Sequence, residues 1–331
     1  MDSSRARWQR RIFGLRLVLL VVIAVAAGSV IALAFGLTGA EATVYSAYGD
    51  PDKPVLAQVL AGDGRPAEFQ ERFDLTDDEK DRVLTALREE NDTLRAQYEA
   101  SERMVDAARA DDLSPEAITK KVARSGYEEK VRETVAHTKK TVEGIVRVAK
   151  KPELEAWVNG RFAEDARAAE SDDGYVPSDA GDAYSAASTS GHSCGVWMSW
   201  YTVRRDAPQR QVALPHRALK FKGGYRVRIT TRNGKRTWNP VTEAGPWNVR
   251  DNYWAKPRNR DLFSDLPRCK PEAEAAYYRN YHNGKDQFGR PVTSPAGIDI
   301  TPGVAKKIGI WKRLRFRGLM EVRVYYPWLR S

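Results

Sequence analysis

The sequence predicts a multi-domain protein with an apolar N-terminal helix, a central helical region and an all-β C-terminal domain. Residues 17–40 form a run of 24 residues without a charged side chain. Residues 74–169 are rich in Glu, Lys, Arg and Ala and show helical periodicity, whereas short apolar and polar alternations follow Cys194. The expected boundaries are 1–16 for a basic flank, 17–40 for the apolar helix, 41–169 for the helical region, 170–191 for a linker and 192–331 for the β domain.

The apolar run is long enough to cross a membrane, because a bilayer core requires about 20 apolar residues. Five arginines precede it, at positions 5, 7, 10, 11 and 16. Since positive flanks stay in the cytoplasm, we expect a single-pass anchor with the remaining chain outside the cytoplasm. Cleavage and secretion are the alternative, because Ala40-Glu41-Ala42 resembles a small-residue cleavage site.

The central region begins with a helix start signal, since Thr76 and Glu79 have the spacing of a capping box. A seam of heptad type follows, formed by Leu84, Leu87, Asn91, Leu94, Tyr98, Ser101, Val105 and Ala108. A second stripe contains Val131, Val135, Thr138, Val142, Ile145 and Ala149. The two stripes predict a helical hairpin. It is either a coiled-coil stalk that forms a homodimer or a helical subdomain that packs on itself.

Charge is distributed unevenly along the chain. The formal net charge is +10, but residues 192–331 contain 28 basic and 10 acidic side chains. A basic domain attracts polyanions such as acidic cell-wall polymers or nucleic acid. The expected export of this domain argues against nucleic acid. Between the two regions, residues 170–191 are rich in Ser, Asp, Gly and Ala and predict a flexible linker.

The C-terminal domain has the pattern of a small β-barrel. Strand-like alternation occurs at 196–201, 225–230 and 320–325. Asn233-Gly234 lies between two such runs and predicts a tight hairpin. Short strands with few helices are typical of a closed barrel.

Four motifs occur in the order found in the rare lipoprotein A family. They are Ser199-Trp200-Tyr201, Pro215-His216-Arg217-Ala218-Leu219, Thr242-Glu243-Ala244-Gly245-Pro246 and Gly297-Ile298-Asp299-Ile300-Thr301. The domain therefore resembles that family from about residue 195 to residue 328. The resemblance implies a six-stranded double-psi β-barrel, shared with expansins, and action on peptidoglycan as a septal-ring lytic transglycosylase. The alternative is an expansin-like module that binds wall glycan without cleaving it.

The resemblance also implies the catalytic residues. His216 and Glu243 take the presumed catalytic positions, and Asp299 is expected to line the cleft. A partly buried carboxyl group with a raised pKa can protonate a glycosidic oxygen, so Glu243 is the expected general acid and base. The family pattern has Asp and Arg where this chain has Glu243 and Ala244.

The segment between Trp247 and Pro295 is longer than in the family and is rich in aromatic residues. We expect an insertion over the cleft, with Trp247, Asp251, Tyr253 and Trp254 binding the substrate. Exposed aromatic rings of this kind would form a platform for sugar rings. The alternative is that these aromatics form a small core of the insertion.

The chain has two cysteines, Cys194 and Cys269, which predict one disulfide if the domain lies outside the cytoplasm and two buried thiols otherwise. The four histidines, at positions 137, 192, 216 and 282, are scattered and lack the spacing of metal ligands. We therefore expect no metal and no cofactor.

Overall fold

The computed structural model describes residues 47–62, 64–147, 150–170, 191–203 and 207–329. The chain divides into two compact units, of which the second spans Val44–Ser331. The predicted membrane anchor at 17–40 and nearly all of the predicted linker at 170–191 lie outside the described residues. Among the helices that are described, none combines the length and apolar character that a membrane crossing requires.

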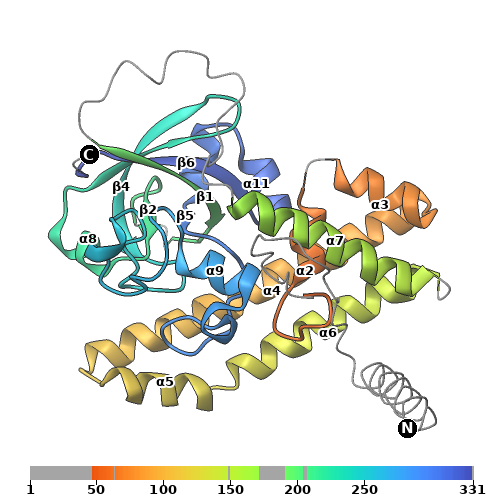
Figure 1. The fold of residues 1–331 in the computed structure, drawn as a ribbon, viewed down its shortest axis with the longest axis horizontal. Helices are drawn as coiled ribbons and strands as arrows, with labels where there is room; N and C mark the ends of the chain where they lie inside the picture. The colour runs from red at the N-terminus through yellow and green to blue at the C-terminus, as the bar shows by residue number, and fades with distance from the viewer. Residues whose placement is uncertain (1–46, 63, 148–149, 171–190, 204–206, 330–331) are drawn as a thin grey trace, which may run out of the picture. The chain divides into compact units, whose positions relative to one another are not determined.

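The second unit contains a helical region followed by a barrel, as the sequence predicts (Figure 1). The helices of the first part are α2 (Val55–Leu60), α3 (Arg65–Phe73), α4 (Asp77–Ala110), α5 (Pro115–Arg124), α6 (Tyr127–Ile145) and α7 (Lys151–Glu170). The barrel part contains the helices α8 (Arg217–Lys222), α9 (Glu272–Arg279), α10 (Pro302–Lys307) and α11 (Trp311–Arg317), with short 3-10 turns at η2 (Pro257–Asn259) and η3 (Tyr281–Gly284).

The predicted helical hairpin is formed by α4 and α6. Helix α4 starts at the expected capping box, in which the Thr76 hydroxyl accepts a hydrogen bond from the backbone N–H of Glu79. Buried positions of α4 include Leu87 and Leu94 from the first stripe, and α6 contacts α4 along its length. The heptad seam is therefore used inside one chain. A homodimer through this region stays a prediction.

Six strands in the described part of the chain form a closed barrel. They are β1 (His192–Trp200), β2 (Val212–Leu214), β3 (Arg226–Thr230), β4 (Arg236–Ala244), β5 (Ile298–Ile300) and β6 (Met320–Tyr326). Their order around the barrel is β1-β5-β2-β4-β3-β6. The β1–β5 and β2–β4 neighbours are parallel, and the other pairings are antiparallel.

The tight turn between β3 and β4 confirms the predicted hairpin. Gly234 has a φ of +76°, a conformation that residues with a Cβ rarely adopt. The pairing aligns Thr230 with Arg236 and Arg226 with Pro240. Because alternate side chains face opposite sides of a strand, Val227 and Ile229 point into the barrel core, where both are fully buried.

The helical region shares one hydrophobic cluster with the long segment after Trp247, whereas the barrel strands enclose a second cluster of their own. Helix α9, inside the long segment after Trp247, packs against α7, and the ring of Phe162 lies 5.2 Å from that of Tyr278. Lys53, which precedes α2, donates from its Nζ to the carbonyl oxygens of Ala276 and Tyr277 near the end of α9. The insertion therefore joins the barrel to the helices instead of forming a core of its own.

The predicted disulfide is confirmed, because Cys194 on β1 is bonded to Cys269 in the insertion. The two residues are 75 positions apart. Closing a loop of this length restricts the unfolded chain, which corresponds to roughly 4 kcal/mol in the chain-entropy account.

Candidate functional site

Four strands place a row of side chains on one outer face of the barrel. Ser199 on β1 is in register with Asp299 on β5, and Asp299 is in register with Ala213 on β2. Ala213 is in turn aligned with Glu243 on β4. Neighbouring strands lie about 4.8 Å apart, so the backbones of Asp299 and Glu243 are roughly 10 Å apart. The small methyl group of Ala213 separates the two acidic residues.

Asp299 is the buried carboxyl group of this row. Its neighbours Ile298 and Ile300 point into the barrel core, so Asp299 points outward, where α4 covers it. The Ser199 hydroxyl donates a hydrogen bond to the carboxyl oxygen Oδ1. Burial raises the pKa of Asp299 to about 7, although the hydrogen bond from Ser199 and the charge of Arg95 partly oppose the shift. Near neutral pH, this group can therefore donate a proton.

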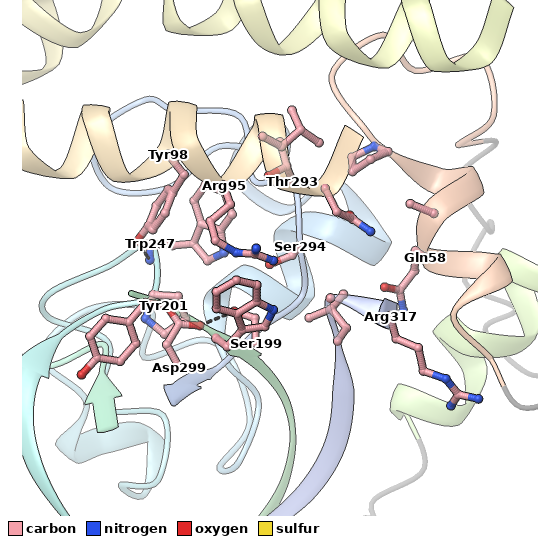
Figure 2. Close-up of a pocket in the computed structure, with 18 of the residues that line it drawn as sticks. Gln58, Arg95, Tyr98, Ser199, Tyr201, Trp247, Thr293, Ser294, Asp299 and Arg317 are labelled. Atoms are coloured by element: carbon pink, nitrogen blue, oxygen red, sulfur yellow. Dashed lines mark hydrogen bonds between the residues drawn. The ribbon is translucent and has the colours of Figure 1, made fainter. Parts of the chain in front are cut away.

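Helix α4 forms the outer wall of the cavity over Asp299. Figure 2 shows α4 lying across the barrel strands, with Arg95 and Tyr98 directed from the helix toward the strands. The guanidinium of Arg95 lies 3.5 Å from the ring centroid of Trp200, in a cation–π contact. The Tyr98 hydroxyl accepts a hydrogen bond of 2.8 Å from the backbone N–H of Trp247. The pocket beneath α4 is partly open to solvent, with an accessible volume of about 80 Å³.

A buried ion network fixes α4 to the insertion. Arg290 is fully buried and pairs with Asp286 at 2.6 Å and with Glu102 of α4. Arg290 also donates a hydrogen bond of 2.7 Å to the carbonyl oxygen of Trp247. At the edge of the cavity, the Thr202 hydroxyl donates a hydrogen bond of 3.0 Å to the carboxylate of Glu99 on α4. The helix is therefore an integral wall of the site in this conformation.

Glu243 lies at the other end of the row and is half-exposed. Lys220 of α8 binds its carboxylate at 2.5 Å. Burial, together with the charges of Glu243 and Asp299, raises the pKa of the Tyr201 hydroxyl, so both acids act on this side chain. The structure thus groups two of the predicted catalytic residues, Glu243 and Asp299, around Tyr201.

His216 faces a different environment. Its Nε2 lies 3.0 Å from the Asp261 carboxylate, and its ring meets that of Trp254 edge to face at 6.1 Å. Helix α8 begins directly after His216, and Lys220 lies one turn further along it. The described contacts of His216 are to the insertion, whereas those of Glu243 are to Lys220 and Tyr201.

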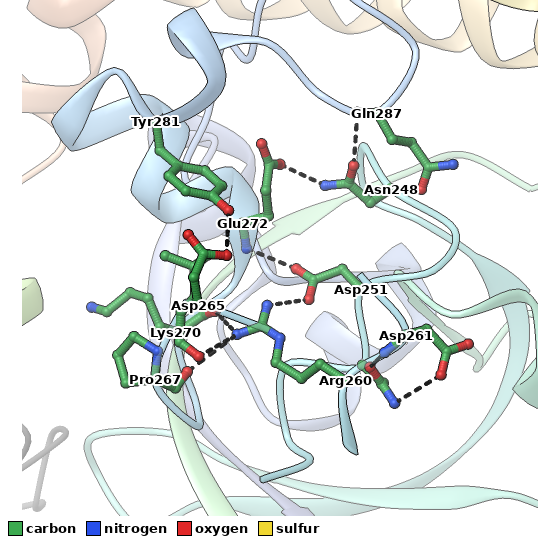
Figure 3. A network of polar contacts seen from close by, with 12 residues as sticks. Asn248, Asp251, Arg260, Asp261, Asp265, Pro267, Lys270, Glu272, Tyr281 and Gln287 are labelled. Carbon is green, nitrogen blue, oxygen red and sulfur yellow. Dashed lines mark hydrogen bonds and ion pairs between the residues drawn. The ribbon is translucent and has the colours of Figure 1, made fainter. Parts of the chain in front are cut away.

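Asp251 belongs to a buried polar network, which corrects its prediction as a substrate ligand. Figure 3 shows its carboxylate between Arg260 and the backbone N–H of Glu272. The Asp251–Arg260 ion pair measures 2.5 Å, and both side chains are fully buried or nearly so. Glu272 also accepts a hydrogen bond of 2.7 Å from Asn248. All of these bonds hold the insertion in place.

None of the three rings of the predicted exposed aromatic platform is exposed. Tyr253 is fully buried and its hydroxyl meets that of Tyr326 at 2.6 Å. Trp254 is also buried and stacks on Tyr326 at 5.1 Å. Trp247 is buried too, but it lines the cavity beside Asp299. The aromatic residues therefore pack the barrel and its insertion.

Sequence reasoning did not single out the residues of α4 that complete the site. Arg95 and Glu99 belong to a long amphipathic helix, where charged residues usually face water. Ser199 was available as a signal, because it stands next to Trp200 in the opening motif and two residues before Tyr201.

One cluster of described residues has the composition of a metal site, namely His192, Cys194 and Cys269. Its two sulfur atoms are joined in the disulfide, so neither is available as a thiolate ligand. The His192 Nε2 lies 3.2 Å from the sulfur of Cys269.

Residues 198–316 match a family described as a domain of unknown function (DUF8814). The matched part contains Ser199, Glu243 and Asp299, but it contains neither α4 nor β6. No curated protein and no solved structure matches the chain.

Proposed function

We propose that the barrel acts on peptidoglycan as a lytic transglycosylase, with Asp299 as the acid that protonates the glycosidic oxygen. The observation that carries this assignment is the burial of Asp299 between β5 and α4, which raises its pKa to about 7. A carboxyl group with such a pKa keeps its proton near neutral pH and is suited to general acid catalysis.

The reaction needs one group that first gives and then accepts a proton. The acid donates its proton to the glycosidic oxygen as the bond from that oxygen to the anomeric carbon breaks. The 6-hydroxyl of the same sugar then bonds to the anomeric carbon and closes an anhydro ring. Its proton returns to the carboxylate, so no water is consumed. Asp299 suits both steps, and Tyr201 and Ser199 are placed to orient the sugar hydroxyls.

Glu243 is assigned a second role in this proposal. It is held by Lys220 and is half-exposed, so it differs from Asp299 in both burial and partner. Its place two strands from Asp299 suits a carboxylate that stabilises the positive charge developing on the sugar.

The proposal assumes that the barrel has the double-psi fold of the rare lipoprotein A family. The closed barrel of six described strands and its two parallel neighbour pairs, β1–β5 and β2–β4, are compatible with this assignment. The four sequence motifs also occur in the expected order, and two of them supply Glu243 and Asp299.

The proposed location is outside the cytoplasm, with the barrel tethered by the apolar segment at 17–40 or secreted after its cleavage. The disulfide between Cys194 and Cys269 supports this location, because structural disulfides persist mainly in oxidising compartments.

A specific observation favours a second candidate, a wall-binding module that does not cleave. Helix α4 lies over Asp299 and is tied to the insertion by the ion pair between Glu102 and Arg290. Cleavage requires a glycan to reach Asp299 beneath this helix, whereas a binding module has no such requirement.

The two candidates are separated by incubating the full chain with peptidoglycan sacculi and analysing soluble products by mass spectrometry. The cleavage proposal expects anhydro-muropeptides from the wild type and their loss in Asp299→Asn. Sedimentation with sacculi without any anhydro products would replace it with the binding module. If the protein neither binds sacculi nor releases products, both candidates fail.

A further inference from the structure

The segment that forms α8, β3 and most of β4 is strongly basic. Residues 217–242 include eight basic side chains and no acidic one, at positions 217, 220, 222, 226, 228, 232, 235 and 236. Two large hydrophobic side chains are exposed among the described residues, and both lie in this segment: Phe221 is 66% and Trp238 44% exposed. Exposed aromatic rings among cations, without nearby carboxylates in sequence, indicate a binding surface.

Strand register arranges these groups in a row. Arg228 on β3 is paired with Trp238 on β4 and with Tyr325 on β6. Cross-strand partners share a face, so the three side chains stand together outside the barrel, opposite the buried Val227 and Ile229. The Arg228 guanidinium lies 4.8 Å from the ring centroid of Tyr325 and 5.8 Å from that of Trp238. The two strands that flank β3 thus supply two aromatic rings, 6.0 Å apart, that both contact one guanidinium.

An open hollow of about 660 Å³ adjoins this row. Trp238 and Trp328 line it together with Gly223 and Gly224, which precede β3. A Cβ at either glycine would have no atom within 4 Å, so the backbone there is bare and open to a ligand. Arg226 is exposed at the same hollow. The surface is shallow and open, and it combines aromatic rings with positive charge.

We propose that this face, defined by Arg226, Arg228, Arg236, Trp238, Tyr325 and Trp328, binds an acidic polysaccharide chain. Guanidinium groups form paired hydrogen bonds with carboxylates, and aromatic rings offer flat apolar faces to pyranose rings. The glycine backbone beside Trp238 and Trp328 leaves room for an extended chain to lie across the two rings. The identification of the chain as wall glycan rests on the proposed function.

Under this proposal, one polymer is held at two faces. The basic face binds the carboxylate-bearing strand, and the Asp299 face meets it elsewhere on the same barrel. The two faces are made by different parts of β4, since Trp238 lies near its start and Glu243 near its end.

The test measures binding of the full chain to peptidoglycan glycan strands freed of their peptides, whose lactyl groups carry carboxylates. The same strands after amidation of these carboxylates serve as the uncharged probe. We expect binding to the native strands to weaken with added salt. Trp238→Ala and the double variant Arg226→Ala/Arg236→Ala should each raise Kd at least tenfold, and the amidated strands should bind the wild type as weakly.

The matched control is Lys120→Ala/Lys121→Ala, which removes the same charge from exposed positions on α5. This control should stay within twofold of the wild type. Variants of the basic face that bind like this control would overturn the proposal. Tighter binding of a single-stranded oligonucleotide, or of vesicles of phosphatidylglycerol, at the same salt would assign the face to that ligand instead. Intact strand binding without any anhydro product would refute the cleavage proposal alone.

Discussion

The two outer faces of the barrel differ in how far their charged side chains are exposed to water. On the covered face, α4 excludes water from Asp299 and raises its pKa to about 7. On the basic face, Arg226 and Arg236 are exposed and keep their hydration. The same scaffold therefore yields a neutral proton donor on one side and fixed positive charge on the other. The difference comes from what covers each face, because both are built on regular strands.

The largest expected effect concerns the attachment of α4 to the insertion. Arg290→Met leaves Asp286 and Glu102 without their buried counter-charge. Breaking a buried ion pair in this way should lower the free energy of unfolding by about 3–5 kcal/mol. Denaturant unfolding monitored by tryptophan fluorescence measures the change. Arg258→Met, at an exposed position in η2, is the control and should stay close to the wild type. A loss below 1 kcal/mol for Arg290→Met would show that the network does not hold the helix.

The next effect concerns the acid on the covered face. Asp299→Asn should reduce the rate of anhydro-muropeptide release by at least about 100-fold, since it removes the transferable proton. Binding to sacculi should remain. Glu243→Gln is the comparison variant, for which we expect a smaller loss. If Glu243→Gln abolishes the reaction and Asp299→Asn does not, the acid has been assigned to the wrong carboxyl group.

A pH effect on stability should follow from the same burial. Between the ordinary pKa of 3.8 and the value of about 7, folded Asp299 keeps a proton that the unfolded chain releases. The protonated Asp299 contributes its full share to the free energy of unfolding below pH 3.8. This share decreases as the pH rises above 3.8 and is lost once the pH has passed 7. Asp299→Asn has no proton to lose. Its free energy of unfolding relative to wild type should therefore rise by roughly 3 kcal/mol between pH 5 and pH 8. Urea titrations at both pH values test this, and an unchanged difference would mean that Asp299 is not shielded.

The smallest effect concerns the edge of the cavity. Glu99→Ala removes the hydrogen bond from Thr202 to α4, which loosens the cover, and it also removes a charge that helps to raise the pKa of Asp299. If movement of α4 limits access, product release should increase about two- to fivefold, because one hydrogen bond contributes roughly 1 kcal/mol. Glu89→Ala, exposed on the same helix, is the control and should leave the rate unchanged. Equal rates for both variants and the wild type would argue against an opening step at this edge.

Local signals in the sequence predicted much of the fold. The capping box at Thr76, the hairpin at Asn233-Gly234 and the disulfide between Cys194 and Cys269 are all present. Each depends on a short pattern or on a single available pairing. The order of helical region and barrel is also as expected.

The relation between the two halves was not predictable in the same way. Arg95 has the pattern of a solvated helix residue, yet it stacks on Trp200 from a distant strand. The sequence around Tyr253 and Trp254 is compatible with either surface or core positions. Only the folded structure shows that both pack against Tyr326 of β6. Contacts of this kind depend on which surfaces meet, and periodicity within one segment carries no information about its partner.

The network that anchors α4 also sets an order of assembly. Glu102 and Arg290 are 188 positions apart, and the Tyr98 hydroxyl bonds a backbone group 149 positions away. Contacts between distant parts of a chain form slowly. We therefore expect α4 and α6 to pair before the barrel forms and binds to them. A chain being made from its N-terminus would present Glu102 to water until residue 290 has emerged. Closure over Asp299 would then be among the last events of folding, after the strands that carry it are in place.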